Sequence, residues 1–313
     1  MHLYGLLILI RKRFLFVQAC YPTDGKRSEH TTWARATLAL ARLAQLDPGG
    51  NLGNRPRRSL RETFILWHPQ TAALWEGQLR VLGTVLEREP AVGWNLHVDL
   101  MPKFNVSLMD RSGPEWREWL VDQSPTLTTR EWSRRLRDVL TQMMTVVGVN
   151  GDRSSDLIGA IPELPNDLHD HVVSSLERLD AEALQAEARA KVWSALRTVL
   201  AHHRPFPDAD SALPANRLNR LEALYVRFEP TESVARYGWL FSDAVVLPHG
   251  RRNDWVAEER KIAEARRDGV EAIYESSGSE GIELLASVVD NPYHLGGAFG
   301  ANDRQAPEYS YPK

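Results

Sequence analysis

The stretch Asp254–Tyr274, DWVAEERKIAEARRDGVEAIY, indicates the fold of this chain most clearly. Its apolar side chains recur at helical spacing, and charged side chains fill most positions between them. The apolar stripe consists of Trp255, Ile262, Val270, Ile273 and Tyr274. This spacing places the stripe on one face of an α-helix and the charges on the rest of its surface. The stretch therefore predicts an amphipathic helix.

Similar patterns continue through most of the chain, with proline and glycine between the helices. The helix predicted at Trp33–Leu46 is followed by Asp-Pro-Gly-Gly, which stops it. We expect further helices at 59–67, 71–89, 90–102, 128–147, 155–161, 166–179, 181–203, 215–228, 231–241, 254–276 and 279–289, with an aromatic helical turn or two at 114–120. Only Ser242–Leu247 and the first few residues have the apolar run of a strand, which argues against a parallel α/β sheet. We predict a mainly α fold, either an irregular α-solenoid of HEAT- or TPR-like stacked helices or a helical bundle.

Local signals suggest where the helices begin and where the chain divides. Ser59-Leu-Arg-Glu62 and Thr128-Thr-Arg-Glu131 are capping boxes, in which the side chains satisfy free backbone N–H groups. Gly148–Ser155, which contains Asn150-Gly151, is the most linker-like stretch. We expect a poorly defined segment at 1–30, helical-repeat subdomains at 31–147 and 156–299, and a disordered tail at 300–313. No strict repeat period is visible.

Composition restricts the possible functions. The formal net charge of −3 gives no global reason to expect nucleic acid as a partner. The single cysteine, Cys20, allows no internal disulfide and fits a reducing compartment, so we expect a cytoplasmic protein. Leu3–Ile10 is apolar, but it is far shorter than the roughly 20 residues of a membrane helix. We therefore expect no membrane insertion.

Phosphate binding and nucleophilic chemistry find little support in the sequence. Gly49–Asn54 has glycines but lacks the lysine of a phosphate loop, and it follows a helix, so a helix end and turn is the simpler interpretation. Cys20 lies in an apolar run, where a thiol is inert. His97 and Asp99 are candidate acid/base groups on a helix otherwise used for packing. No motif implies a cofactor, so none is expected.

Histidines offer the one metal hypothesis. His169, His202 and His203, with Asp170, could converge from neighbouring helices onto a metal ion, although their spacing is not that of a known metal motif. The simpler interpretation places these histidines on polar helix faces at the surface.

Basic and aromatic residues are the candidates for partner binding. Arg55–Arg58 and Arg134–Arg137 are the densest basic segments, the second of which also fits a solvated helix face. Ten tryptophans, against eight phenylalanines and eight tyrosines, are typical of large rings at contacts between helices. A partner-binding platform could use the candidate residues Trp67, His68, Trp116, Trp119, Arg134 and Arg135. The simpler interpretation is that the tryptophans wedge adjacent repeats together.

Several segments carry a resemblance to a known group of proteins. Leu38–Glu62, Trp67–Thr71, Arg88–Trp94 and Pro114–Trp119 resemble the helical-repeat region of very large bacterial proteins, and the likeness continues to about Val289 through His203–Phe206 and Tyr237–Phe241. In those proteins the region follows a signalling or effector module, often a STAND-type NTPase, in defence systems. The resemblance implies a helical-repeat fold whose catalytic residues, if any, belong to an upstream module. Residues 1–25 and 300–313 do not continue the pattern, so we expect a fragment of a longer reading frame.

The sequence supports three hypotheses about function. The first is a non-enzymatic interaction or sensor module that binds a protein partner, or another module of the same signalling or anti-phage NTPase system. The second is a metal-dependent hydrolase that uses the clustered histidines, which measurement of bound zinc or manganese would test. The third is a nonfunctional gene remnant, which would be poorly soluble and bind dyes that detect exposed apolar surface.

Overall fold

The structure is a computed structural model that describes residues 27–49, 55–67, 73–103, 127–248, 255–289 and 291–302. These residues form two compact units. Unit 1 runs to Gly148 and includes Glu163–Pro165; unit 2 comprises Val149–Pro162 and the described residues from Asn166 onward. The prediction of a mainly α fold is confirmed, because no residue in the described ranges belongs to a strand and Ser242–Leu247 has irregular backbone. Among these helices, none is both long enough and apolar enough to cross a membrane.

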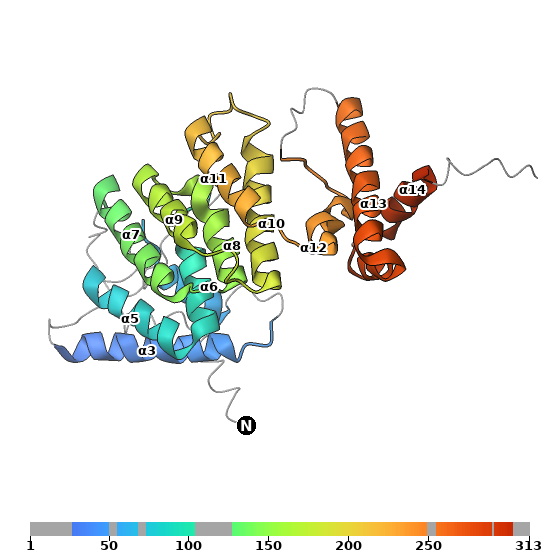
Figure 1. The fold of residues 1–313 in the computed structure, drawn as a ribbon. Coiled ribbons are helices and arrows are strands. Elements are labelled where there is room, and N and C mark those ends of the chain that lie inside the picture. Colours follow the sequence, from blue (N-terminus) through green and yellow to red (C-terminus); the bar gives the residue numbers. More distant parts are fainter. Residues whose placement is uncertain are drawn as a thin grey trace, which may run out of the picture. The chain divides into compact units, whose positions relative to one another are not determined.

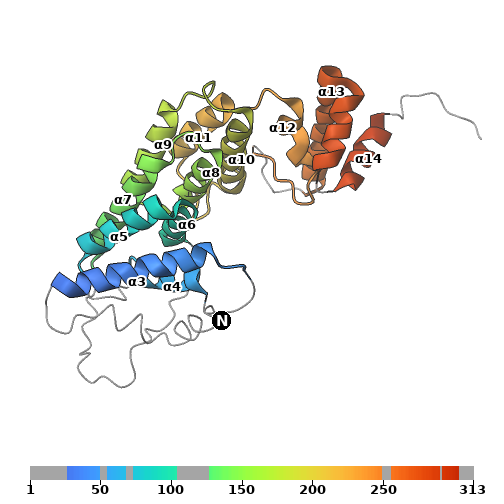
Figure 2. The ribbon, with the colours of Figure 1, turned by 90° about the horizontal axis from the view of Figure 1, so that it is seen from below.

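Unit 1 contains helices that contact one another as stacked two-helix repeats do. Its helices are α3 (Arg27–Gln45), α4 (Pro56–Thr63), α5 (Trp75–Arg88), α6 (Pro90–Leu100) and α7 (Thr129–Val146). Helix α3 packs on α4 and α5 on α6, while α3 also contacts α5 and α4 contacts α6 (Figures 1 and 2). Helix α7 then packs on both α5 and α6. Each helix thus contacts both its neighbour and the next but one, as in an α-solenoid.

Large side chains fill the core of unit 1. The ring of Trp33 on α3 meets that of Phe64, which follows α4, with centroids 5.7 Å apart. Phe64, Leu82 and Leu140 are fully buried, and each such side chain stabilises the fold by about 2 kcal/mol relative to exposure. Gly93 permits the close contact of α5 and α6, because a Cβ there would lie 2.4 Å from the Leu86 Cα.

Four further helices begin unit 2, and one of them starts inside the predicted linker. They are α8 (Gly151–Ala160), α9 (Asn166–Arg178), α10 (Ala186–His203) and α11 (Ala215–Arg227), with a 3₁₀ turn, η1, at Ile161–Glu163. The two units divide between Gly148 and Val149, within the stretch 148–155 that was expected to be linker-like, but residues 151–155 of that stretch are helical. Asn150 is the N-cap of α8, and its side chain accepts a hydrogen bond from the Arg153 N–H at 3.0 Å. Helix α8 packs on α10, α10 on α11, and α9 on α11.

The last helices of unit 2 surround a small core of their own. They are α12 (Ser233–Tyr237), the 3₁₀ helix η2 (Gly238–Phe241), α13 (Trp255–Val288) and α14 (Pro292–Asn302), and they lie together in both views (Figures 1 and 2). The core comprises Leu240, Phe241, Val270, Ile273, Leu285, Leu295 and Ala298. Gly278 interrupts α13 with a φ of 61° and a ψ of −150°, a conformation that only glycine adopts readily. Two helical segments therefore meet at this residue.

Of the two capping boxes predicted from the sequence, one is present at the start of its helix and the other is not. Thr128 is the N-cap of α7, as predicted, and its hydroxyl accepts a hydrogen bond from the Glu131 N–H at 3.2 Å. Ser59 is not a cap, because α4 begins three residues earlier at Pro56, a residue suited to the first turn. Glu62 instead forms an ion pair with Arg58.

Arginines from neighbouring helices bind the last carbonyl groups of several helices. Arg227 donates to the carbonyls of Leu176, Glu177 and Leu179 at the end of α9, at 2.5, 2.8 and 2.9 Å. Arg189 on α10 reaches the carbonyls of Arg227 and Phe228 at the end of α11, each at 3.4 Å. Such donors satisfy carbonyls that have no partner within the helix, and their charge complements its dipole.

Candidate interaction surface

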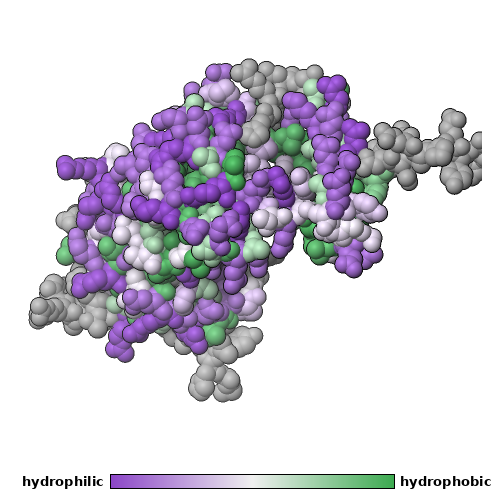
Figure 3. Space-filling model, in the orientation of Figure 1, coloured by the Kyte–Doolittle hydropathy of each residue, from purple (hydrophilic) through white to green (hydrophobic). Residues whose placement is uncertain are grey.

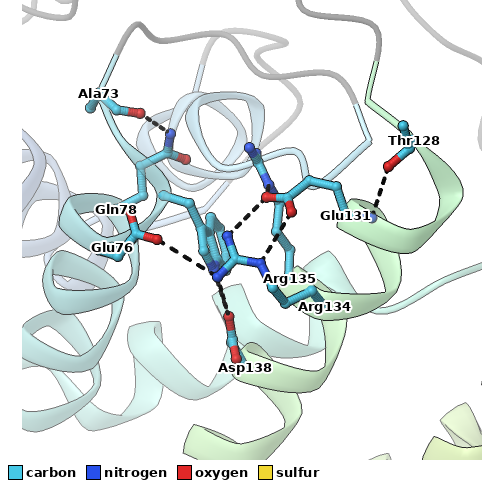
Figure 4. A network of polar contacts seen from close by, with 9 residues as sticks. Ala73, Glu76, Gln78, Thr128, Glu131, Arg134, Arg135 and Asp138 are labelled. Atoms are coloured by element: carbon cyan, nitrogen blue, oxygen red, sulfur yellow. Dashed lines mark hydrogen bonds and ion pairs between the residues drawn. The ribbon is translucent and has the colours of Figure 1, made fainter.

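Arg134, a predicted partner-binding residue, lies in an ionic network between α5 and α7 (Figure 4). Its guanidinium group is 2.9 Å from Glu131, 3.7 Å from Glu76 and 3.9 Å from Asp138. The hydrogen bond from Arg134 is the main reason that the pKa of Glu131 is below its ordinary value. Arg134 thus already has three carboxylates around it within unit 1.

Arg135 lies deeper in the same network. Its side chain is buried; Nε donates to Glu131 at 3.2 Å, and the guanidinium group lies 5.1 Å from the centre of the Trp75 ring. The Trp75 indole donates in turn to Asp138 at 2.7 Å. Cation–π contact and hydrogen bonding therefore join α5 to α7, and this arrangement favours a structural role for Arg134 and Arg135.

The predicted aromatic platform lies largely outside the described residues. Trp67 follows α4 and is half-buried. His68, Trp116 and Trp119 are not among the described residues. The platform therefore stays a prediction.

His97 and Asp99 face different partners. His97 is completely buried, with Nδ1 2.7 Å from the Gly93 carbonyl oxygen and Nε2 3.0 Å from Gln142 Oε1. Burial lowers the pKa of His97, against the opposing effect of these two hydrogen bonds. Asp99 instead forms ion pairs with Arg57 at 3.0 Å and Lys103 at 3.3 Å. The pair therefore does not share a reaction site.

The three histidines of the metal hypothesis have separate surroundings. His169 is buried on α9, and burial followed by repulsion from Arg217 lowers its pKa. On α10, His202 is exposed and its Nδ1 lies 2.7 Å from the Thr198 carbonyl oxygen, while His203 Nδ1 accepts from the Leu213 N–H at 3.4 Å. Within the described ranges, no group of three or more His, Cys, Asp or Glu side chains has a metal-binding arrangement.

Exposed apolar side chains point to a different part of the molecule. Of the twelve large hydrophobic side chains that are exposed among the described residues, seven belong to α13 and α14. We call these seven the C-terminal surface: Trp255, Val256, Tyr274, Leu284, Val288, Tyr293 and Phe299. On the face drawn in Figure 3, hydrophilic residues predominate and hydrophobic ones occupy smaller areas between them. The concentration on two helices therefore differs from the rest of the described chain.

Hydrogen bonds hold α14 in place beside this surface. Arg266 on α13 donates to the Leu240 carbonyl at 2.7 Å and the Ser242 carbonyl at 3.2 Å, and its Nη1 lies 3.0 Å from His294 Nδ1 on α14. Asn291 donates to Asp243 at 2.6 Å just before α14 begins. These contacts fix α14 against α13 and η2, so that Tyr293 and Phe299 are presented from an anchored helix.

The sequence interpretation did not identify the C-terminal surface. Trp255 and Tyr274 belong to the predicted apolar stripe, and the spacing of that stripe did not reveal that they are 73% and 59% exposed. One signal in the sequence sets apart residues 268–302, which hold five of the seven side chains: this segment contains six Asp or Glu and no Lys or Arg.

Comparisons of the chain with protein-family models, with curated proteins and with solved structures found no match.

Proposed function

We propose that this chain is a non-enzymatic helical interaction module that binds a protein partner through the C-terminal surface. The supporting observation is the concentration of exposed apolar side chains on α13 and α14. Clustered apolar side chains on a polar surface are typical of protein-binding sites. The lone cysteine suits a reducing compartment, so we place the interaction in the cytoplasm.

The resemblance to helical-repeat regions of bacterial STAND-type NTPase proteins suggests the wider context. In that context the module would act as the sensor or docking part of a signalling or anti-phage system, and catalysis would belong to another component. Products of adjacent genes are accordingly the first partners to test.

Site-specific photo-crosslinking tests the proposal. The full chain would carry benzoyl-phenylalanine at Leu284 and be co-expressed with the products of adjacent genes. The matched control carries the same group at Val226, which is exposed on α11. We expect irradiation to attach one defined protein at position 284 and not at 226. Equal adducts at both positions, or none at 284, would contradict the proposal.

A further inference from the structure

The second half of α13 presents an apolar row on its outer side. Leu284 and Val288 are four residues apart, hence on one face of the helix, and they are 54% and 57% exposed. Leu285, by contrast, is fully buried in the core of the α12–α14 cluster. Glu280 precedes Leu284 by one turn and continues the same row.

The segment of sequence that contains this row carries acidic side chains and no basic ones. Residues 268–302 carry a formal charge of −6, although the whole chain carries only −3. Glu271, Glu275, Glu280 and Glu283 are exposed, and none has an ion pair or hydrogen bond from its side chain to another described residue. Elsewhere in the described chain carboxylates such as Glu131 and Glu177 are bound by arginine. These four glutamates thus form no ion pair with another described residue.

We propose that this part of the C-terminal surface binds a cationic amphipathic helix of the partner protein. The inference deepens the proposed function and rests on it. An amphipathic helix would lay its apolar side chains on Leu284 and Val288, and its flanking lysines or arginines would meet the glutamates. Nucleic acids and anionic membranes carry negative charge and would be repelled by the same glutamates.

Binding of two synthetic helical peptides to the full chain tests the partner's chemistry. One peptide has leucine on one face and lysine on the other; the second replaces every lysine with glutamate. We expect fluorescence anisotropy to show the lysine peptide binding at least roughly tenfold more tightly than the glutamate peptide. The difference should shrink as salt concentration rises.

Variants of the chain assign this binding to the surface. Glu280→Lys with Glu283→Lys, and separately Leu284→Ser with Val288→Ser, should each weaken binding of the lysine peptide at least roughly tenfold. The control is Asp208→Lys with Asp210→Lys, which makes the same charge change at two other exposed positions and should change affinity less than about twofold. Circular dichroism would verify that each variant is folded.

The outcomes separate this inference from the proposed function. The proposal that the partner contributes a cationic helix is contradicted if both peptides bind equally, or if the control variant weakens binding as much as the α13 variants do. The proposed function survives that result when Val288→Ser, in the chain that carries benzoyl-phenylalanine at position 284, still abolishes crosslinking of the partner. It fails together with the inference when Val288→Ser leaves crosslinking unchanged and Leu284→Ser with Val288→Ser leaves peptide binding unchanged.

Discussion

Gly151 lies where the first turn of α8 meets α10, and the contact has no room for a side chain. A Cβ at this position would lie 2.6 Å from the Ala188 Cα and 2.9 Å from its carbonyl oxygen. Both are backbone atoms, so α10 itself would have to shift to accommodate a methyl group. The residue is therefore defined by packing between helices.

We expect Gly151→Ala to lower the free energy of unfolding by about 1–3 kcal/mol, because the two helices must move apart. Gly159→Ala, in the same helix, is the matched control, since a Cβ at that position would meet nothing within 4 Å. That change should be neutral or stabilising by up to about 1 kcal/mol through helix propensity. Urea denaturation measures both, and equal effects would contradict the packing argument.

His97 is buried between two oxygen atoms that both accept hydrogen bonds. Gln142 Nε2 donates to the Leu79 carbonyl at 2.9 Å, which turns Gln142 Oε1 toward the ring. A neutral imidazole has one N–H and can satisfy only one of its two neighbours, Gly93 O and Gln142 Oε1. Protonation would satisfy both, yet burial opposes the charge more strongly, and the pKa of His97 is lowered.

A lowered folded-state pKa makes stability depend on pH. Below pH 6.5, the ordinary pKa of His, the His97 side chain is protonated in the unfolded chain but stays neutral in the folded one. The free energy of unfolding should therefore fall as pH decreases from 6.5 toward the lowered pKa of folded His97. Above that window the contribution is complete. His97→Gln should show a smaller decrease in the free energy of unfolding between pH 7.5 and 5.5 in urea titrations. An unchanged dependence in His97→Gln would refute this role.

At the scale of the element, helix ends in this chain depend on residues distant in sequence. Arg227 from α11 completes the end of α9, and Arg189 from α10 completes the end of α11. Arg61 from α4 similarly donates to the Asp99 carbonyl at the end of α6, at 3.3 Å. Each arginine thereby combines helix capping with contact between two helices.

Arg227→Met should lower the free energy of unfolding by about 1 kcal/mol, because three carbonyl contacts are lost while the apolar stem remains. Arg217→Met, on the same helix, is the control, since the Arg217 guanidinium makes no hydrogen bond or ion pair with another described residue. Thermal denaturation compares them. A loss at Arg217 as large as that at Arg227 would rule out a specific contribution from the carbonyl contacts.

Capping offers a second comparison between elements. Thr128→Ala removes the acceptor for the Glu131 N–H and should lower the free energy of unfolding by about 1 kcal/mol. Ser59→Ala alters a residue inside α4 and should change it by less than about 0.5 kcal/mol. Urea denaturation measures both losses, and a larger loss for Ser59→Ala than for Thr128→Ala would contradict this assignment of the caps.

At the scale of the whole molecule, the described residues divide into two compact units. Leu140→Ala creates a cavity in unit 1 and should cost about 2–5 kcal/mol. Hydrogen exchange should accelerate in α5–α7 and stay unchanged in α8–α11, and Leu221→Ala in unit 2 should give the opposite pattern. Acceleration spread over both units by either variant would show that they unfold together.

Periodicity was sufficient to predict the helical fold, because burial of an apolar stripe requires its side chains to recur at helical spacing. Periodicity could not predict the structure at Asn150-Gly151. The same two residues suit a turn, or, as observed, an N-cap followed by a glycine in close contact with another helix. Periodicity also could not distinguish Tyr274, which is exposed, from its buried neighbour Ile273. For the candidate residues Arg134 and Arg135, their positions in the chain indicate the charge but not the carboxylates and the indole that bind them.

The absence of lysine and arginine from residues 268–302 also determines which reagents can report on the C-terminal surface. Trypsin cleaves after Lys and Arg, so Asp268–Arg304 remains one peptide that carries Tyr274, Leu284 and Val288 together. Reagents that couple primary amines find no lysine within it. Chemistry directed at carboxylates would instead label Glu271, Glu275, Glu280 and Glu283, and protection of these groups by a bound partner would appear as a mass change in that single peptide.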